Sequence, residues 1–374
     1  MELSVLPLEQ WGMPRKAPFL CAGPCSAESE EQLLETARGI ERGGISLLRA
    51  GLWKPRTQPG TFEGVGVRGL EWLTRAGQAI DVPVATEVAT PQHVEACLKH
   101  NIHVLWIGAR TTTNPFAVQA LADALLGTDI PVFVKNPISP DVELWIGAIH
   151  RLWNAGLRRI GAIHRGFSTS KKILYRNAPN WKIPIELKRR IPAIPLLCDP
   201  SHICGRGDLI FSIAQEALDL LYDGLMVEVH RSPAEALSDS GQQLTPGEFH
   251  ELVRRLTIKR ESADSSEYQT RIRELRHEID TIDEHMLQLL SKRMEIAAKM
   301  GDLKRKNNIS VLQPHRWEEI IESRRAMGEE LGLSGEFLFQ LLQIIHEEAI
   351  EQQETKVRKT GSGEERKEKT DEGQ

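Results

Sequence analysis

Eight short runs rich in Val, Ile and Leu alternate with longer stretches of helical periodicity over residues 1–256. Such alternation is typical of βα units, in which parallel strands are buried on both faces and joined by helices. Eight units predict a closed (β/α)8 barrel. The alternative is an open doubly wound sheet, but GPCSAES lacks the glycine fingerprint that opens the first helix of that fold. The runs lie near residues 18–23, 45–51, 82–88, 103–110, 130–136, 158–166, 193–200 and 224–231.

Four potential metal ligands follow or end three of these runs. They are Cys25 after the first run, His202 after the seventh, and Glu228 and Asp239 at and after the eighth. Barrel enzymes carry their chemistry at this end of the strands. A thiolate, an imidazole and two carboxylates suit a first-row divalent metal ion such as Mn²⁺, Fe²⁺, Co²⁺ or Zn²⁺. Glu228 is the most telling, because a carboxylate between Val227 and Val229 needs a cationic partner.

A ring of cations is expected at the same end of the barrel. Taken singly, an Arg or Lys is usually a solvated surface charge. Together, so many cations would repel one another unless an anion offsets them, so they predict a clamp for phosphate and carboxylate groups. The six cations are Arg49, Lys54, Arg56, Arg110, Lys135 and Arg165.

The pattern changes after residue 256, where a polar, serine-containing stretch at 257–269 is a candidate linker. Beyond it, apolar residues recur at steps of three and four, which predicts a helix over about 270–306, followed by helices near 315–328 and 335–354. A single helix of that length needs helical partners to bury its apolar face. The charged stretch 355–374 is expected to be a disordered tail.

One position in this helical pattern is occupied by a cation. Arg293 lies where Ile279, Met286 and Met300 stand in the neighbouring repeats, so a guanidinium enters an apolar seam and needs an anion. Lys304 lies on nearly the same face, whereas Arg276 is about 100° round the helix and several turns away. Two antiparallel copies would bring Arg276 of one chain to the Arg293 and Lys304 of the other, which predicts a site shared in a homodimer.

Composition adds few constraints. The net charge is −5 with 47 Lys and Arg residues spread along the chain, so no nucleic-acid partner is expected. The five cysteines lack a CxxC pair and argue against a secreted disulfide framework. Neither a signal peptide nor a membrane span is apparent. We therefore expect a cytoplasmic protein that does not insert into membranes.

The strand-end motifs AGPCSAES, LLRAGLWKPRT, IGAR, HRG, DPSH, MVEVH and ALSDSGQQL resemble those of the 3-deoxy-D-arabino-heptulosonate 7-phosphate (DAHP) synthases over residues 18–250. The resemblance implies condensation of phosphoenolpyruvate with erythrose 4-phosphate, the first step of the shikimate pathway. It also implies that the four ligands named above hold the metal and that Arg56 and Thr57 bind erythrose 4-phosphate. The implied phosphoenolpyruvate clamp consists of Arg49, Lys54, Arg110, Lys135 and Arg165.

Two further roles follow from this resemblance. Lys54 is a proton donor to the new alkoxide, and His230 positions a water molecule. The Asn136-Pro137 pair departs from the glycine-containing turn that the family leads us to expect after Lys135. The runner-up is an octulosonate 8-phosphate synthase that uses arabinose 5-phosphate; KPRT at 54–57 argues against it.

Residues 270–354 resemble the all-helical chorismate mutase domain, through LRHEIDTIDEHMLQLLSKRMEIAAKMGDLKRK, ISVLQPHRWEEI and FLFQLLQIIHEEAIEQQ. The implied reaction is the rearrangement of chorismate to prephenate, with Arg276, Arg293 and Arg316 on the carboxylates and Lys304 and Gln353 on the ether oxygen. Gln313, Trp317 and Ala349 stand where the family usually has Asp, Glu and Ser.

Two readings of the helical segment remain. A dimerisation and regulatory module without chemistry is the alternative to a mutase. The fusion, with little chain before the first predicted strand, also leads us to expect that prephenate bound in the helical domain inhibits the barrel.

Overall fold

The computed structural model describes residues 3–13, 17–54, 60–170, 173–259 and 265–364. It divides into two compact units, Met1–Glu261 and Ser262–Gln374. Each is described by itself. Within the described residues, no helix is both long and apolar enough to cross a membrane.

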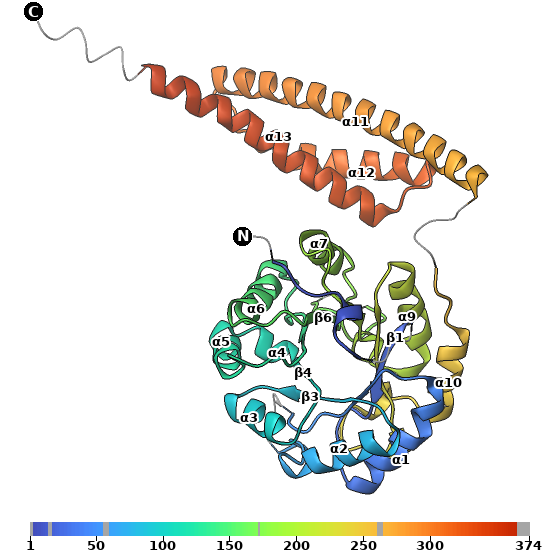
Figure 1. The fold of residues 1–374 in the computed structure, drawn as a ribbon. Helices are drawn as coiled ribbons and strands as arrows, with labels where there is room; N and C mark the ends of the chain where they lie inside the picture. The colour runs from blue at the N-terminus through green and yellow to red at the C-terminus, as the bar shows by residue number, and fades with distance from the viewer. Residues whose placement is uncertain (1–2, 14–16, 55–59, 171–172, 260–264, 365–374) are drawn as a thin grey trace, which may run out of the picture. The chain divides into compact units, whose positions relative to one another are not determined.

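The first unit is a closed barrel of parallel strands in the order β1 to β8 (Figure 1), as the alternating pattern predicts. Pairing of β1 with β8 closes the sheet, with Gly23 opposite Glu228. The strands are Phe19–Gly23 (β1), Leu47–Arg49 (β2), Val84–Val88 (β3), Val104–Ile107 (β4), Val132–Lys135 (β5), Ile160–His164 (β6), Leu196–Cys198 (β7) and Gly224–Glu228 (β8).

Helices surround these strands. Several begin at side-chain caps, for example Ser29, whose hydroxyl accepts from Gln32 N, and Thr245, which forms a capping box with Glu248. They are Glu30–Ile40 (α1), Arg68–Ala79 (α2), Pro91–Lys99 (α3), Ala109–Thr112 (α4), Pro115–Ala124 (α5), Val142–Asn154 (α6), Lys182–Arg190 (α7), Pro200–Cys204 (α8), Ile210–Asp219 (α9) and Pro246–Arg255 (α10), with 3-10 turns at Leu8–Gln10, Glu41–Gly43, Gly207–Leu209, Pro233–Glu235 and Ser240–Gln242.

Several strands are shorter than the apolar runs that predicted them. The run at 103–110 contains both β4 and the start of α4, and β2 is confined to Leu47–Arg49. Hydrophobicity marks burial and not hydrogen bonding in a sheet, so buried residues that leave the ladder still read as strand. The shortening places the cations at 49, 110 and 135 at or beyond the strand ends.

Two hydrophobic cores support the barrel. The larger lies between the sheet and the surrounding helices, and the smaller fills the barrel interior. Trp11, which precedes β1, belongs to the interior core and packs on Phe133 with ring centroids 4.9 Å apart. Cys21 is also in this core and is fully buried.

Gly23, at the end of β1, is required by its surroundings. Its φ of 146° lies outside the range that side chains adopt readily, and an added Cβ would collide with the Arg49 backbone carbonyl. This close approach of β1 and β2 sets Cys25 beside Arg49.

The second unit consists of α11 (Ser266–Lys306), α12 (Pro314–Glu330) and α13 (Gly335–Glu364). The three predicted helices are present with similar starts. At its far end, however, α13 continues through residues 355–364, part of the stretch expected to be a disordered tail. This stretch contains the good helix formers Lys356, Arg358 and Lys359, but also Gly361 and Gly363, which are poor ones. Extending an existing helix needs no new nucleus, so the helix continues through them. Residues 365–374 lie outside the described residues.

Candidate functional site

Cys25, Glu228 and Asp239 meet at the C-terminal end of the strands. Their potential ligand atoms all lie within 4.8 Å of one another. Glu228 is the last residue of β8, Cys25 follows β1, and Asp239 has a left-handed backbone (φ 46°) next to a 3-10 turn. The pairing of β1 with β8 brings residues more than 200 positions apart into one cluster.

His202 lies beside this group on the short helix α8. Its Nε2 is 3.8 Å from Glu228 Oε1, and its Nδ1 is 2.8 Å from Asp199 Oδ2. A carboxylate behind an imidazole is the usual arrangement for fixing the ring of a metal-binding histidine. His202 therefore presents Nε2 toward Glu228, beside the group of Cys25, Glu228 and Asp239.

Each of the three potential ligands Cys25, Glu228 and Asp239 has a positively charged neighbour. Lys54 Nζ lies 2.9 Å from Cys25 Sγ, Arg49 Nη2 lies 3.2 Å from Glu228 Oε1, and Arg176 Nη1 donates to Asp239 Oδ1 over 3.0 Å. These contacts bring three cations from different loops and strands onto one buried cluster.

The pKa values of the donors reflect this environment. Burial raises the pKa of the Cys25 thiol to about 12, reinforced by Glu228. Burial would also raise the pKa of Glu228, but the nearby His202 and Arg49 outweigh it and lower that pKa. The pKa of Asp239 is lowered in the same way, against burial, by His202 and Arg176. The two carboxylates are therefore charged, whereas the thiol needs a cation of higher charge, such as a divalent metal ion, to lose its proton.

The donor set fits a divalent metal ion. Glu228 is fully buried, and within the described part of the chain its Oε1 accepts no hydrogen bond although Arg49 is close. A buried carboxylate oxygen without a hydrogen bond is costly unless a ligand satisfies it. One soft sulfur, one imidazole and two carboxylates would satisfy Mn²⁺, Fe²⁺, Co²⁺ or Zn²⁺ without identifying which.

A cation-lined cavity of about 270 Å³ adjoins these donors, with Arg110, Lys135, Arg165, Arg176 and His202 among its walls. Lys135 is paired with Asp199 at 2.7 Å. Burial lowers the pKa of Arg165 to about 10, with Arg110 and Arg176 adding to the shift and Asp199 opposing it. Such crowding of positive charge favours an anionic ligand.

Asn136, which departs from the expected glycine turn, joins two strand ends. Its side-chain nitrogen donates to the carbonyls of Pro137 (2.7 Å) and Gly166 (2.9 Å), and its oxygen accepts from Arg165 N (2.7 Å). The asparagine thus holds the residues after β5 against those after β6 and fixes the backbone that carries Arg165.

Other predicted residues have different surroundings. His230 is buried, but its Nδ1 accepts from Ser232 N and its Nε2 lies 3.6 Å from Glu28 Oε2. Its neighbours are therefore its own loop and the segment before α1, and not the three-residue group. Arg110 is exposed at the cavity rim. Arg56 and Thr57 lie outside the described residues.

Asp199, Arg176, Asn177 and Gln242 belong to the site but were missed from the sequence. Asp199 stands in the DPSH motif beside His202, a signal that was available. Gln242 stands in the ALSDSGQQL motif, so a signal was available for it as well. Arg176 and Asn177 stand in the loop between β6 and α7, away from any strand end, and only the fold brings them in.

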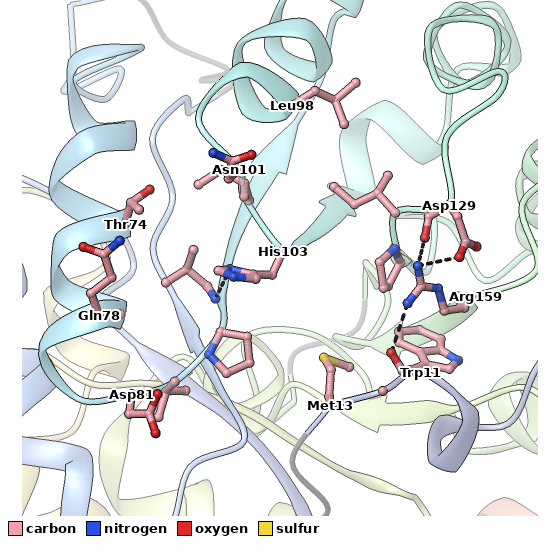
Figure 2. A pocket seen from close by; sticks show the side chains of 18 residues that line it. Trp11, Met13, Thr74, Gln78, Asp81, Leu98, Asn101, His103, Asp129 and Arg159 are labelled. Atoms are coloured by element: carbon pink, nitrogen blue, oxygen red, sulfur yellow. Dashed lines mark hydrogen bonds and ion pairs between the residues drawn. The ribbon is translucent and has the colours of Figure 1, made fainter.

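A larger cavity, of about 820 Å³, lies at the opposite end of the barrel (Figure 2). Its walls include Trp11, His103 and Arg159, and Arg159 is already paired there with Asp129 and the Trp11 carbonyl. It lies at the N-terminal ends of the strands, where barrels are stabilised and not where they carry their chemistry.

In the helical unit, α11 and α13 bring Arg293, Lys304, His346 and Gln353 to one region. Gly301 of α11 lies so close to Gln353 that a Cβ would crowd its backbone. Arg293 and Lys304 both lower the pKa of His346, after burial. Arg293 donates to the Ile345 carbonyl and Lys304 to the Val311 carbonyl, and neither has a carboxylate partner among the described residues. Gln353 Oε1 is buried without a hydrogen bond.

The remaining mutase candidates do not join this region within one chain. Arg276 is exposed and Arg316 is paired with Glu319. Of the departures, Trp317 stacks on His346 with ring centroids 4.0 Å apart, Ala349 is buried, and Gln313 caps α12 without a side-chain hydrogen bond.

Comparison with known proteins accounts for both units. The model of the DAHP synthetase I family matches residues 15–263. The chain belongs to this family. The model of chorismate mutase type II matches residues 275–354. The barrel of this DAHP synthase family member is thus followed by a chorismate mutase domain, and the two domains support both activities.

Individual relatives agree with this assignment. A phospho-2-dehydro-3-deoxyheptonate aldolase of Thermotoga maritima is 33% identical over 63% of this chain and 68% of its own length. A crystal structure of that enzyme superposes with a TM-score of 0.58 at 31% identity, covering 63% of this chain and 67% of the other. A 2-dehydro-3-deoxyphosphooctonate aldolase of Acidithiobacillus ferrooxidans is more distant, 27% identical over 63% of this chain and 87% of its own length.

Proposed function

We propose that the barrel condenses phosphoenolpyruvate with erythrose 4-phosphate and water to give DAHP and inorganic phosphate. The observation that carries this proposal is the cluster of Cys25, Glu228 and Asp239 beside a cation-lined cavity. The cavity supplies charge for a phosphate and a carboxylate, and the cluster supplies ligands for a metal. We assign residues 1–256 to the barrel enzyme and residues 270–354 to the mutase; the expected linker 257–269 includes the first turn of α11, which begins at Ser266.

Four donors would hold the metal: Cys25, His202, Glu228 and Asp239. When bound, the metal supplies a Lewis acid for the aldehyde oxygen. Arg49, Arg110, Lys135 and Arg165 then hold phosphoenolpyruvate by its phosphate and carboxylate while its C3 attacks the aldehyde carbon. Lys54, close to Cys25 Sγ, donates a proton to the new alkoxide. Water adds at C2, and phosphate leaves from the same carbon.

Erythrose 4-phosphate is favoured over arabinose 5-phosphate as the partner sugar. Relatives named for the octulosonate reaction are 26–27% identical, against 33% for the heptonate enzyme. Arg56 and Thr57 are the proposed phosphate ligands. The test is turnover of the full-length chain with each sugar after chelation and readdition of Mn²⁺, Fe²⁺, Co²⁺ or Zn²⁺. Equal or faster turnover of arabinose 5-phosphate would reverse the assignment.

We further propose that the helical unit rearranges chorismate to prephenate in a site built by two copies. Arg293 and Lys304 are partly buried and have no carboxylate partner among the residues that the structure describes, which suits a dicarboxylate. Arg316 and Gln353 complete the proposed set. Large apolar residues of α11 are exposed, among them Ile279 (57%), Ile282 (57%) and Leu289 (67%), so a second helix is needed to cover them.

Subunit complementation tests the shared site. Arg276→Ala and Arg293→Ala chains should each be inactive as mutases, but heterodimers place both substitutions in one site and leave the other intact. Random mixing should restore about a quarter of wild-type turnover. Recovery of no activity, with heterodimers shown to form, would place all the cations in one chain and remove the argument for a shared site.

Prephenate is the proposed regulator of the barrel, because the product site is fused to the pathway's first enzyme. DAHP synthase kinetics of the full-length chain at saturating prephenate test this, and unchanged kinetics would reject it. The cytoplasm is the proposed location, in keeping with five cysteines that are all free.

A further inference from the structure

The loop between β6 and α7 carries two adjacent residues, Arg176 and Asn177, that contact both halves of the barrel site. Arg176 Nη1 donates to Asp239 Oδ1 (3.0 Å) and to Gln242 Oε1 (2.7 Å). Gln242 Nε2 in turn donates to Glu228 Oε2 over 2.6 Å. One guanidinium therefore orients two carboxylates, one directly and one through a carboxamide.

Asn177 makes the second set of contacts. Its side-chain oxygen accepts from Arg165 Nη1 (2.9 Å), and its nitrogen donates to the His202 carbonyl (2.6 Å). The backbone nitrogens of Arg176 and Asn177 donate to the carbonyls of Cys204 and Ile203, which fixes the dipeptide to α8, the helix that carries His202. Arg165, a cation of the anion cavity, is thus tied to the same element as the imidazole donor.

The carboxamide of Gln242 is held at both ends and is 1% exposed. It cannot rotate without losing one of its two bonds, so it transmits the position of Arg176 to Glu228. Metal sites tolerate ligand displacements of only about 0.2 Å, so the partners of the ligands influence affinity strongly.

We propose that Arg176, Asn177 and Gln242 are positioning residues that hold the metal donors in register with the anion-binding Arg165. The proposal rests on the metal centre proposed above. Two effects oppose each other at Arg176, because its charge repels a metal ion and competes for Asp239 while its hydrogen bonds restrain the donors. Gln242 is neutral and has only the restraining effect, so it separates the two.

The test measures Co²⁺ affinity of the full-length chain by competition with a chelator, and follows the thiolate-to-Co²⁺ absorption band as a report on Cys25. Gln242→Met and Arg176→Gln should each weaken binding between about tenfold and a hundredfold. Arg176→Lys should recover part of the loss. Asn177→Ala should weaken both Co²⁺ and phosphoenolpyruvate binding. The matched control is Arg189→Gln, which removes an exposed arginine paired with Glu186 and should change neither.

The outcomes separate this inference from the metal centre itself. A wild-type chain without a thiolate-to-Co²⁺ band would remove both. A normal wild-type band with unchanged affinity in Gln242→Met would leave the centre standing and overturn the positioning role. Tighter binding by Arg176→Gln would show that Arg176 competes with the metal, which also overturns it. Arg176 is half exposed, so its variants are expected to keep the fold. They therefore still test the positioning role if Gln242→Met fails to fold.

Discussion

Replacing Ile279 and Ile282 with alanine is expected to separate the two copies of the helical unit that we propose to pair. Each substitution removes three carbon groups, worth roughly 2.4 kcal/mol at about 0.8 kcal/mol per buried group. Both side chains are 57% exposed in the single chain. If a partner chain covers that exposed fraction, each substitution removes about 1.4 kcal/mol of association free energy. A dimer carries four such substitutions, two in each copy, so the total loss is about 5.5 kcal/mol. The dissociation constant of the helical interface should rise by roughly four orders of magnitude.

Sedimentation over a concentration series measures the association, and chorismate turnover at each concentration reports whether the shared site persists. The matched control is Asp280→Ala with Glu284→Ala, which changes exposed polar positions of the same helix. The control should keep wild-type behaviour. If the Ile279→Ala and Ile282→Ala chain retained full mutase turnover when diluted to nanomolar concentration, the seam would not be the interface and the reasoning from its exposure would be refuted.

Asp199→Asn should destabilise the barrel by about 3–5 kcal/mol, because it leaves Lys135 buried without its anion; chemical unfolding measures this. Burial alone would raise the pKa of Asp199, but His202 and Lys135 hold it well below its usual range. Its stabilisation is therefore present above the unfolded pKa of about 4 and lost as the pH falls toward the folded value, so acid unfolding of Asp199→Asn should lack this component. Arg293→Ala should lower chorismate turnover at least tenfold and leave DAHP synthase turnover unchanged, as parallel assays would show; a parallel fall in both would indicate general damage.

The barrel was predictable because parallel strands buried on both faces leave a simple signal in the sequence. The approximate positions of Cys25, Glu228 and Lys135 followed, since residues after parallel strands meet at one end. Arg176 and Gln242 were not predictable in this way. Their role depends on how loops fold over the strand ends, and no periodicity records that. The function of Asn136 was likewise hidden, because two of its three side-chain hydrogen bonds connect segments about 30 residues apart.

In the helical unit, the repeat indicated α11 and the unusual place of Arg293. It could not indicate where α13 ends, because charged residues extend a helix as readily as they form a tail. Nor could it show that Trp317 stacks on His346, since that contact joins separate helices.

The interior core around Trp11 and Phe133 lies between the large cavity at the N-terminal ends of the strands and the cation-lined cavity at their C-terminal ends. Both substrates and both products of the proposed reaction would then enter and leave at the C-terminal end of the strands, past Arg110 at the rim of the cavity. A molecule that sits deeper has to enter before, and depart after, the one above it. We therefore expect the substrate nearer the interior core to bind first.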